Sequence, residues 1–195
     1  FLKDMDTGET SRVSEALVGG NAFSGTPTIN YNGTRIFYST FADNLVLGDT
    51  NGASDIMGWN STTPNIPFRI VGTTGAQLNG NSLYPHCDNT GDRVVFESLA
   101  SNFVGGDING TWDIFLYQQS TDQRRRVSVS TLGLPANGAS FDPKISGDGE
   151  WVVFESDATN LVAGDTNGFR DIFVRELLTG ITKRVSINGA GIQGN

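Results

Sequence analysis

The sequence is poor in the residues that usually build catalytic and zinc centres. Its 195 residues include a single cysteine, Cys87, and a single histidine, His86. A lone cysteine cannot form a disulfide within the chain, and one Cys with one His is too few for a zinc site. The two residues are also adjacent, so on a strand their side chains point to opposite faces and cannot easily act as nucleophile and base. These absences argue against a thiol or zinc enzyme.

The chain also lacks positive charge and long apolar runs. It has 13 Lys and Arg against 21 Asp and Glu, a net charge of −8. Nonspecific nucleic-acid binding needs a basic excess, so it is not expected. The one basic cluster, Arg124–Arg126, is interpreted as a solvated face at the end of a strand. With no run of 18 apolar residues, no membrane span is expected. The chain opens with Phe1 and carries nothing like a signal peptide, so we expect a mature or excised segment.

One loop motif occurs three times in the sequence. GDTNG stands at 48–52 and at 164–168, and GDING stands at 106–110. The interval between the loop aspartates is constant, since 107 − 49 = 58 and 165 − 107 = 58. The same interval relates two further sets of residues: Pro27, Pro85 and Pro143, and Asn21, Asn79, Asn137 and Asn195. Self-similarity at a fixed interval is typical of repeat architectures.

Each repeat unit is predicted to form four short strands. In the third unit the runs FDPKIS, EWVVFESD, DIFVREL and ITKRVSI are rich in Val, Ile and Phe and are bounded by Gly, Asp and Asn. Helical periodicity is absent. Alternation places Val152 and Phe154 on one face of their strand and Trp151 and Val153 on the other, so burial on both faces is expected. Sheets that are apolar on both faces must stack on copies of themselves, and radial stacking of this kind gives a β-propeller.

The stretch from Ser146 to Ser186 follows the pattern S-x-DG-x-x-VVFES-x-A-x-NLV-x-GDTNG-x-x-DIFV-R-x-L-x-TG-x-x-x-RVS. This pattern resembles the TolB-type, WD-like propeller repeat of many bacterial secreted and periplasmic proteins. The resemblance is strong in the second and third units, and the first unit is degenerate. It implies a protein that is secreted, on the cell surface or periplasmic.

The repeat predicts an all-β propeller of four-stranded antiparallel blades with a 58-residue repeat. Residues 1–14 match 173–186, so a two-stranded stub precedes three full blades, giving 2 + 12 = 14 strands. The expected boundaries are 1–20 for the stub and 21–78, 79–136 and 137–195 for the blades. Three and a half blades are fewer than the usual minimum of four.

An incomplete propeller exposes sheet edges and an apolar blade face, which must be covered. In one hypothesis the chain is part of a longer propeller. In the other, a protein partner or further copies of the chain complete the open blade, by closing a ring or by head-to-tail strand exchange. Both hypotheses stay open at this stage.

The repeated loop offers side-chain oxygens at positions 1, 3 and 7. Oxygen ligands at positions 1 and 3 with a tight Gly turn resemble half of a calcium loop, but the acidic groups expected at positions 5 and 12 of an EF-hand are missing. In the alternative, Asp and Asn bond the loop's own backbone and Asn-Gly supplies the positive φ of the turn. The candidate Ca²⁺ ligands are Asp49, Asn51, Asp55, Asp107, Asn109, Asp113, Asp165, Asn167 and Asp171.

No catalytic set stands out, so the favoured function is a non-catalytic, extracytoplasmic binding or assembly module. A propeller fold does not by itself name a ligand. A carbohydrate-binding propeller is the first alternative, because Trp59, Trp112 and Phe169 are placed to stack on sugar rings from blade-top loops. The second alternative is a non-catalytic fragment of a larger propeller-containing enzyme.

Overall fold

The computed structural model describes residues 1–14, 19–64 and 66–194, so Asn195 lies outside the described residues. These residues form 14 strands and no helix, and therefore no helix that could span a membrane. The two-stranded sheet consists of β1 (Leu2–Lys3) and β2 (Thr10–Ser11). The three larger sheets are β3 (Ser24–Ile29), β4 (Arg35–Thr40), β5 (Asp55–Asn60) and β6 (Phe68–Arg69); β7 (Ser82–Cys87), β8 (Arg93–Ser98), β9 (Asp113–Gln118) and β10 (Gln123–Arg126); and β11 (Ser140–Ile145), β12 (Trp151–Ser156), β13 (Asp171–Glu176) and β14 (Thr182–Arg184).

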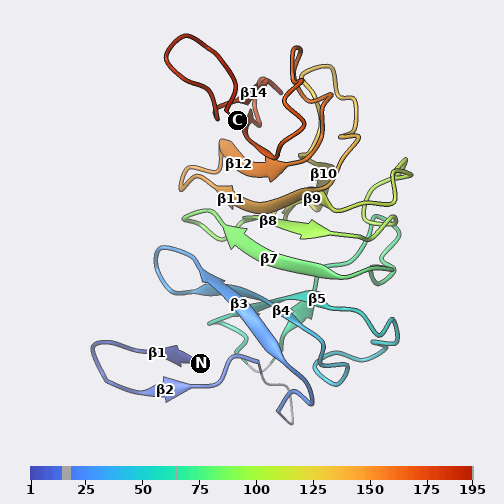
Figure 1. The fold of residues 1–195 in the computed structure, drawn as a ribbon. Helices are drawn as coiled ribbons and strands as arrows, with labels where there is room; N and C mark the ends of the chain where they lie inside the picture. The colour runs from blue at the N-terminus through green and yellow to red at the C-terminus, as the bar shows by residue number, and fades with distance from the viewer. Residues whose placement is uncertain (15–18, 65, 195) are drawn as a thin grey trace.

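Each four-stranded sheet is an antiparallel meander in which neighbours in sequence are neighbours in space. We call these sheets blades 1, 2 and 3 in chain order, and the β1–β2 hairpin the stub. The blades stack face to face along the chain, from the stub at the blue end to blade 3 at the red end (Figure 1). The architecture is that of a partial β-propeller, and the predicted 14 strands are confirmed.

Three apolar cores lie between successive sheets. The core between blades 1 and 2 is built around Phe96, Phe103 and Phe115, which are fully buried and whose ring centroids lie 5.0–6.2 Å apart. Similar cores join blade 2 to blade 3 and the stub to blade 1. Apolar burial of this kind is the main favourable contribution to stability, and it explains why the sheets stack.

The last blade differs from the other two in the burial of its second strand. Strands β4 and β8 are buried on both faces, as the alternation predicts. In β12 only the face of Val152 and Phe154 is buried by blade 2, whereas Trp151 is 38% exposed and Val153 is half-buried. The expectation that this strand is buried on both sides is therefore wrong, because no sheet of the described chain packs on its other face. We call this surface the outer face of blade 3.

The innermost strands β3, β7 and β11 contact one another in series and share a backbone irregularity. Each contains a β-bulge whose residue has a left-handed conformation: Thr26 (φ 47°), Tyr84 (φ 51°) and Asp142 (φ 49°). Each of these residues precedes one of the repeated prolines. Non-glycine residues rarely adopt this left-handed conformation. Its recurrence at the same position of every blade shows that the bulge is a regular part of the repeat.

Candidate functional site

The predicted ligand residues of blade 2 surround an arginine. Asp113 is the first residue of β9, Asp107 lies in the preceding loop, and Arg126 is the last residue of the outermost strand β10. A guanidinium nitrogen of Arg126 lies 2.9 Å from an Asp107 oxygen, and another lies 3.8 Å from Asp113. All three side chains are at least 93% buried, since their exposed fractions are 7%, 5% and 0%.

The same ion pairs recur in the other two blades. In blade 1, Arg69 lies 3.2 Å from Asp49 and 3.3 Å from Asp55. In blade 3, one nitrogen of Arg184 lies 2.9 Å from Asp165 and 3.1 Å from Asp171. We call each set of two aspartates and one arginine a latch, because it ties the outermost strand of a blade to the loop between its second and third strands. The latches are Asp49, Asp55 and Arg69; Asp107, Asp113 and Arg126; and Asp165, Asp171 and Arg184.

The loop asparagines complete the hydrogen bonding of each latch. In blade 2 the Asn109 amide donates to Asp113 at 2.8 Å and to the carbonyl of Ala136 at 3.2 Å, while its oxygen accepts the backbone N–H of Thr111 at 3.3 Å. Asn51 and Asn167 repeat all three bonds in their own blades. The amide oxygen is thus engaged by the loop backbone, an Asx-type arrangement that stabilises the turn.

Burial shifts the titration of carboxyl groups in all three latches. Burial raises the pKa of Asp55 to about 6, with the neighbouring charge of Asp49 acting in the same direction and Arg69 opposing both. Burial likewise raises the pKa of Asp107, Asp113 and Asp165, although an arginine opposes the shift in each case. Burial therefore makes these four carboxylates costly to keep ionised.

These contacts correspond to the self-bonded loop, one of the two hypotheses drawn from the sequence. The guanidinium stands between the two carboxylates that a cation would need, and the asparagine oxygen already accepts a backbone hydrogen bond. Within residues 1–14, 19–64 and 66–194, no three or more His, Cys, Asp or Glu side chains are grouped to hold a metal ion. The donor set as arranged does not fit a calcium ion, and calcium binding stays a prediction.

The latch arginines are the functional residues that sequence reasoning missed. Arg126 belongs to the cluster interpreted as a solvated face, and that interpretation is wrong for two of its three members. Arg126 and Arg124 have side chains only 7% exposed, and Arg124 donates to the carbonyl of Val71 in blade 1 at 2.7 Å. Only Arg125 is exposed. The signal that was available is an arginine followed by Val or Ile in the last strand of each blade and directly after the last strand of the stub.

A groove lies along the innermost strands. It has a volume of about 490 Å³ and is lined by 26–29 of β3, 84–86 of β7 and Lys144 of β11. His86 lies on this groove, and its Nδ1 accepts the backbone N–H of Ile145 at 3.2 Å. Cys87 points to the opposite face, as predicted, where it lies in the core between blades 1 and 2, and burial raises the pKa of its thiol. The adjacent pair is therefore split between the groove and the core.

Comparison with solved structures places this geometry among known folds. TolB from Acinetobacter baumannii superposes with a TM-score of 0.54 at 20% identity, over 88% of this chain and 34% of that protein. A putative TolB from Agrobacterium tumefaciens gives 0.53 at 14% identity, over 84% and 48%. The chain has a TolB-type propeller fold. No protein-family model and no curated protein matches the sequence.

The TolB-type fold is also found in enzymes. An oligogalacturonate lyase solved in complex with manganese has a TM-score of 0.59 at 16% identity, over 94% of this chain and 46% of that protein. The chain spans less than half the length of each of these three structures. Similarity at this level shows the fold and leaves the function to be argued from the site.

The aromatic residues proposed to stack on sugars are not gathered on one surface of this TolB-type fold. Trp59 lies on β5 and is 6% exposed in the core between the stub and blade 1, so its placement on a loop is wrong. Trp112 is half-buried at the junction with blade 3, where its carbonyl accepts the N–H of Ser140 at 2.8 Å. Only Phe169 is well exposed, at 61%.

Glu97 of β8 is a buried carboxyl group that bridges two blades of the TolB-type fold. It is 4% exposed and accepts the backbone N–H of Asp142, the bulge residue of blade 3, at 2.9 Å. Burial raises its pKa from 4.5 to about 7, and the charge of Asp142 adds to the shift. Between these values the native carboxyl keeps its proton while the unfolded one has lost it, so the free energy of unfolding falls as pH rises.

Glu97→Gln is expected to remove this pH dependence. Urea unfolding at pH 5 and pH 8 should show that the variant loses less stability than the wild type, by on the order of 1–2 kcal/mol. Glu155→Gln is the matched control, because Glu155 holds the same place in blade 3 and its side chain is 36% exposed. Equal pH dependence in the wild type and Glu97→Gln contradicts the assignment.

Proposed function

We propose that the protein is a non-catalytic assembly module that acts outside the cytoplasm and stacks head to tail with further copies of itself through its blade faces. The TolB-type fold supports the location. Two features support the absence of catalysis. The buried thiol of Cys87 is poorly suited to act as a nucleophile. The ring nitrogen of His86 that would accept a proton is engaged by a backbone N–H.

The observation that carries the proposal is the outer face of blade 3. In blade 2 the equivalent face is entirely covered by blade 3, and its four core residues are fully buried: Val95, Ile114, Leu116 and Val127. The residues 58 positions later are Val153, Ile172, Val174 and Val185. None of these is fully buried, and Val185 is 47% exposed. The outer face of blade 3 therefore has the apolar residues that contact another sheet in blade 2, but no sheet of the described chain covers it.

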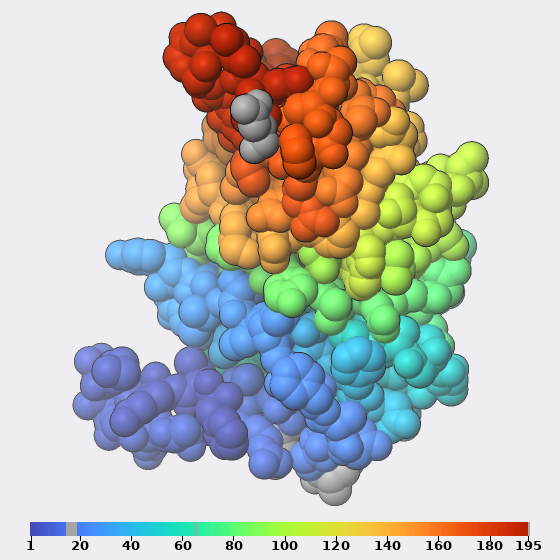
Figure 2. Space-filling model, viewed as in Figure 1, coloured from blue at the N-terminus to red at the C-terminus, as the bar shows by residue number. Residues whose placement is uncertain are grey.

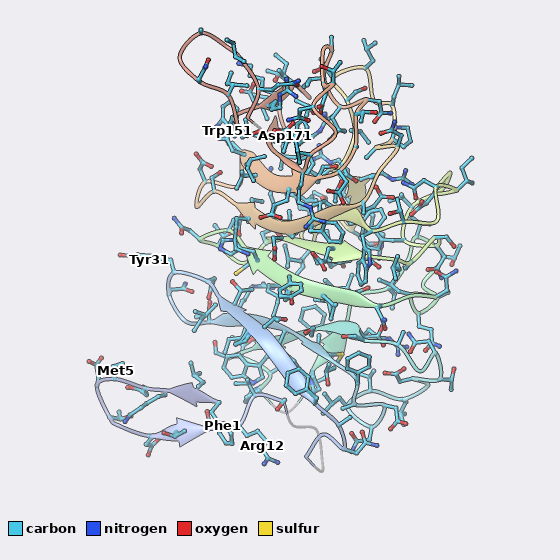
Figure 3. All side chains as sticks on the ribbon, in the orientation of Figure 1. Phe1, Met5, Arg12, Tyr31, Trp151 and Asp171 are labelled. Carbon is cyan, nitrogen blue, oxygen red and sulfur yellow. The ribbon has the colours of Figure 1, made fainter. Side chains whose placement is uncertain are left out.

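The stub offers a complementary group at the other end of the chain. Phe1 matches Phe173, which is fully buried in the core that contains Leu116 and Val127 of the preceding blade. Phe1 is 83% exposed, and the guanidinium of Arg12 lies over its ring at 5.6 Å from the centroid. The β1–β2 hairpin projects from the side of the molecule (Figure 2), with Met5 at its outer end and Phe1 at the end next to the rest of the chain (Figure 3). Stacking of Phe1 on Val174 and Val185 of another copy would continue the blade series.

Light scattering tests this assembly. We expect a particle heavier than the 20.8 kDa chain, with a mass that rises with concentration as an open head-to-tail contact requires. Val174→Asp and Phe1→Ser should each reduce it to the single chain, because the first places a charge in the contact and the second removes its anchor. Leu47→Asp is the control, since Leu47 is fully exposed on a loop and should leave the mass unchanged.

A 20.8 kDa particle at every concentration contradicts assembly between copies. A heavy particle that survives both substitutions places the contact elsewhere and also contradicts the proposal. Turnover of any substrate by the purified chain contradicts the non-catalytic function, independently of its mass.

A further inference from the structure

The groove on the innermost strands is rich in hydrogen-bond donors. Because Nδ1 of His86 accepts the N–H of Ile145, the proton of the neutral ring is on Nε2, which is then a donor. Burial and the nearby charge of Lys144 lower the pKa of His86, so the ring is neutral at pH 7. Thr28 and Tyr84, each of which carries a hydroxyl group, also line the groove.

Lys144 adds a positive charge at a position where the other blades have an acceptor. Thr28 and His86 occupy this position in blades 1 and 2, and each accepts a backbone N–H from the following blade, that of Cys87 at 3.5 Å and that of Ile145 at 3.2 Å. Lys144 can only donate. Its ammonium bonds the carbonyl of Pro143 at 3.2 Å and takes part in no ion pair among the side chains that the structure describes.

The carboxyl groups near Lys144 do not neutralise it fully. Its charge acts on Glu97, which is partly protonated near neutral pH because of burial. Asp142 is two residues away on the same bulged strand and is exposed. The ammonium therefore stays available to an external anion at the edge of the groove.

The walls of the groove are apolar. Pro27 and Pro85 line it, as do Ile29, which is 50% exposed, and Tyr84, which is 43% exposed. The left-handed bulge at Tyr84 precedes Pro85, so the strained backbone of the repeat shapes this wall. Exposed rings beside a cation and an imidazole N–H suit a ligand with an apolar body and one negative group.

We propose that this groove binds the carboxylate of a small ligand, held by Lys144 and His86, with the body of the ligand covered by Tyr84 and the two prolines. A carboxylate accepts both an ammonium donor and an imidazole N–H in charge-assisted hydrogen bonds. Two sources share this chemistry, the C-terminal carboxylate of a peptide and the carboxylate of a uronic acid sugar. The site goes beyond the assembly function and does not require it.

His86 makes the test direct, because it is the only histidine and its ring C–H signals can be identified in a proton NMR spectrum without further assignment. The probes are two matched pairs at constant ionic strength: N-acetylphenylalanine with its amide, and galacturonate with galactose. Spectra are recorded on the Val174→Asp variant, so that assembly does not interfere. We expect a carboxylate to shift the His86 signals in a saturable way while its neutral partner does not.

Lys144→Gln is expected to weaken this binding at least tenfold, the loss of one charge-assisted hydrogen bond. Lys144 is exposed, so the substitution should not disturb folding, and Lys183→Gln on the exposed surface of β14 is the control. The pair with the larger difference identifies the source of the ligand. Equal shifts from acids and neutral partners, no shift from any probe up to about 20 mM, or unchanged binding by Lys144→Gln each overturn the proposal.

Discussion

Replacing Arg126 with methionine is expected to lower the free energy of unfolding by about 3–5 kcal/mol, because it leaves two buried carboxylates without their counter-ion. Asp107 and Asp113 are 5% and 0% exposed and lie 2.9 and 3.8 Å from the guanidinium. Urea unfolding measures the loss. It should be larger at pH 8 than at pH 5, since burial raises the pKa of both aspartates and protonation relieves the charge at acidic pH.

Arg125→Met is the matched control for this substitution. Arg125 is the preceding residue of β10 and is exposed, and among the described residues its side chain bonds only that of Gln123, at 3.3 Å. Its loss should cost less than about 0.5 kcal/mol. Equal costs at the two positions would show that the latch of blade 2 contributes nothing to stability. A chelator separates the two hypotheses for the loop, because it leaves the unfolding midpoint unchanged if the loop is self-bonded and lowers it if the loop holds calcium.

Leu116→Ala is expected to lower the free energy of unfolding by about 2–5 kcal/mol, whereas Val174→Ala should lower it by less than about 1 kcal/mol. The two residues are equivalent in the repeat, since 174 − 116 = 58, and they differ in what covers them. Leu116 is fully buried between blades 2 and 3, and Val174 is on the outer face. Urea unfolding of dilute protein, at a concentration where the chain is single, measures both costs.

A large loss at Val174 under those conditions would mean that another part of the same chain covers the outer face. The comparison therefore examines the open blade within one molecule, while light scattering examines the contact between molecules. Phe115→Leu, with Phe115 fully buried in the neighbouring core, provides a reference for a substitution that leaves the outer face untouched.

The stacking of blades could be predicted because it depends on local patterns that repeat. Consecutive apolar residues define each second strand, and Asn-Gly defines each loop turn: Gly52, Gly110 and Gly168 all have a positive φ of 65–72°. The prediction that β12 is buried on both faces was wrong. Alternation shows that both faces of the strand are apolar, but the sheet that would cover the second face is not part of the described chain.

The latch could not be predicted from the loop motif, because its arginine comes from another strand. Arg126 and Arg184 are 58 residues apart, but 126 − 69 = 57, so the slip in blade 1 hides Arg69 from a search at fixed spacing. The ion pairs also join residues that only the antiparallel pairing of β9 with β10 brings together. The left-handed bulge is hidden for another reason, since Thr26, Tyr84 and Asp142 share a backbone conformation and no side-chain chemistry.

The latch has a consequence for how such a chain can evolve. Both aspartates and the arginine of each latch belong to the same blade, so the cation beside these buried carboxylates is supplied by the blade's own residues. Duplication of the segment that encodes one blade therefore copies all three residues of a latch together with the strands of that blade. Loss or gain of a unit separates no latch carboxylate from its arginine, and selection can change the number of units without first repairing the latches of those that remain.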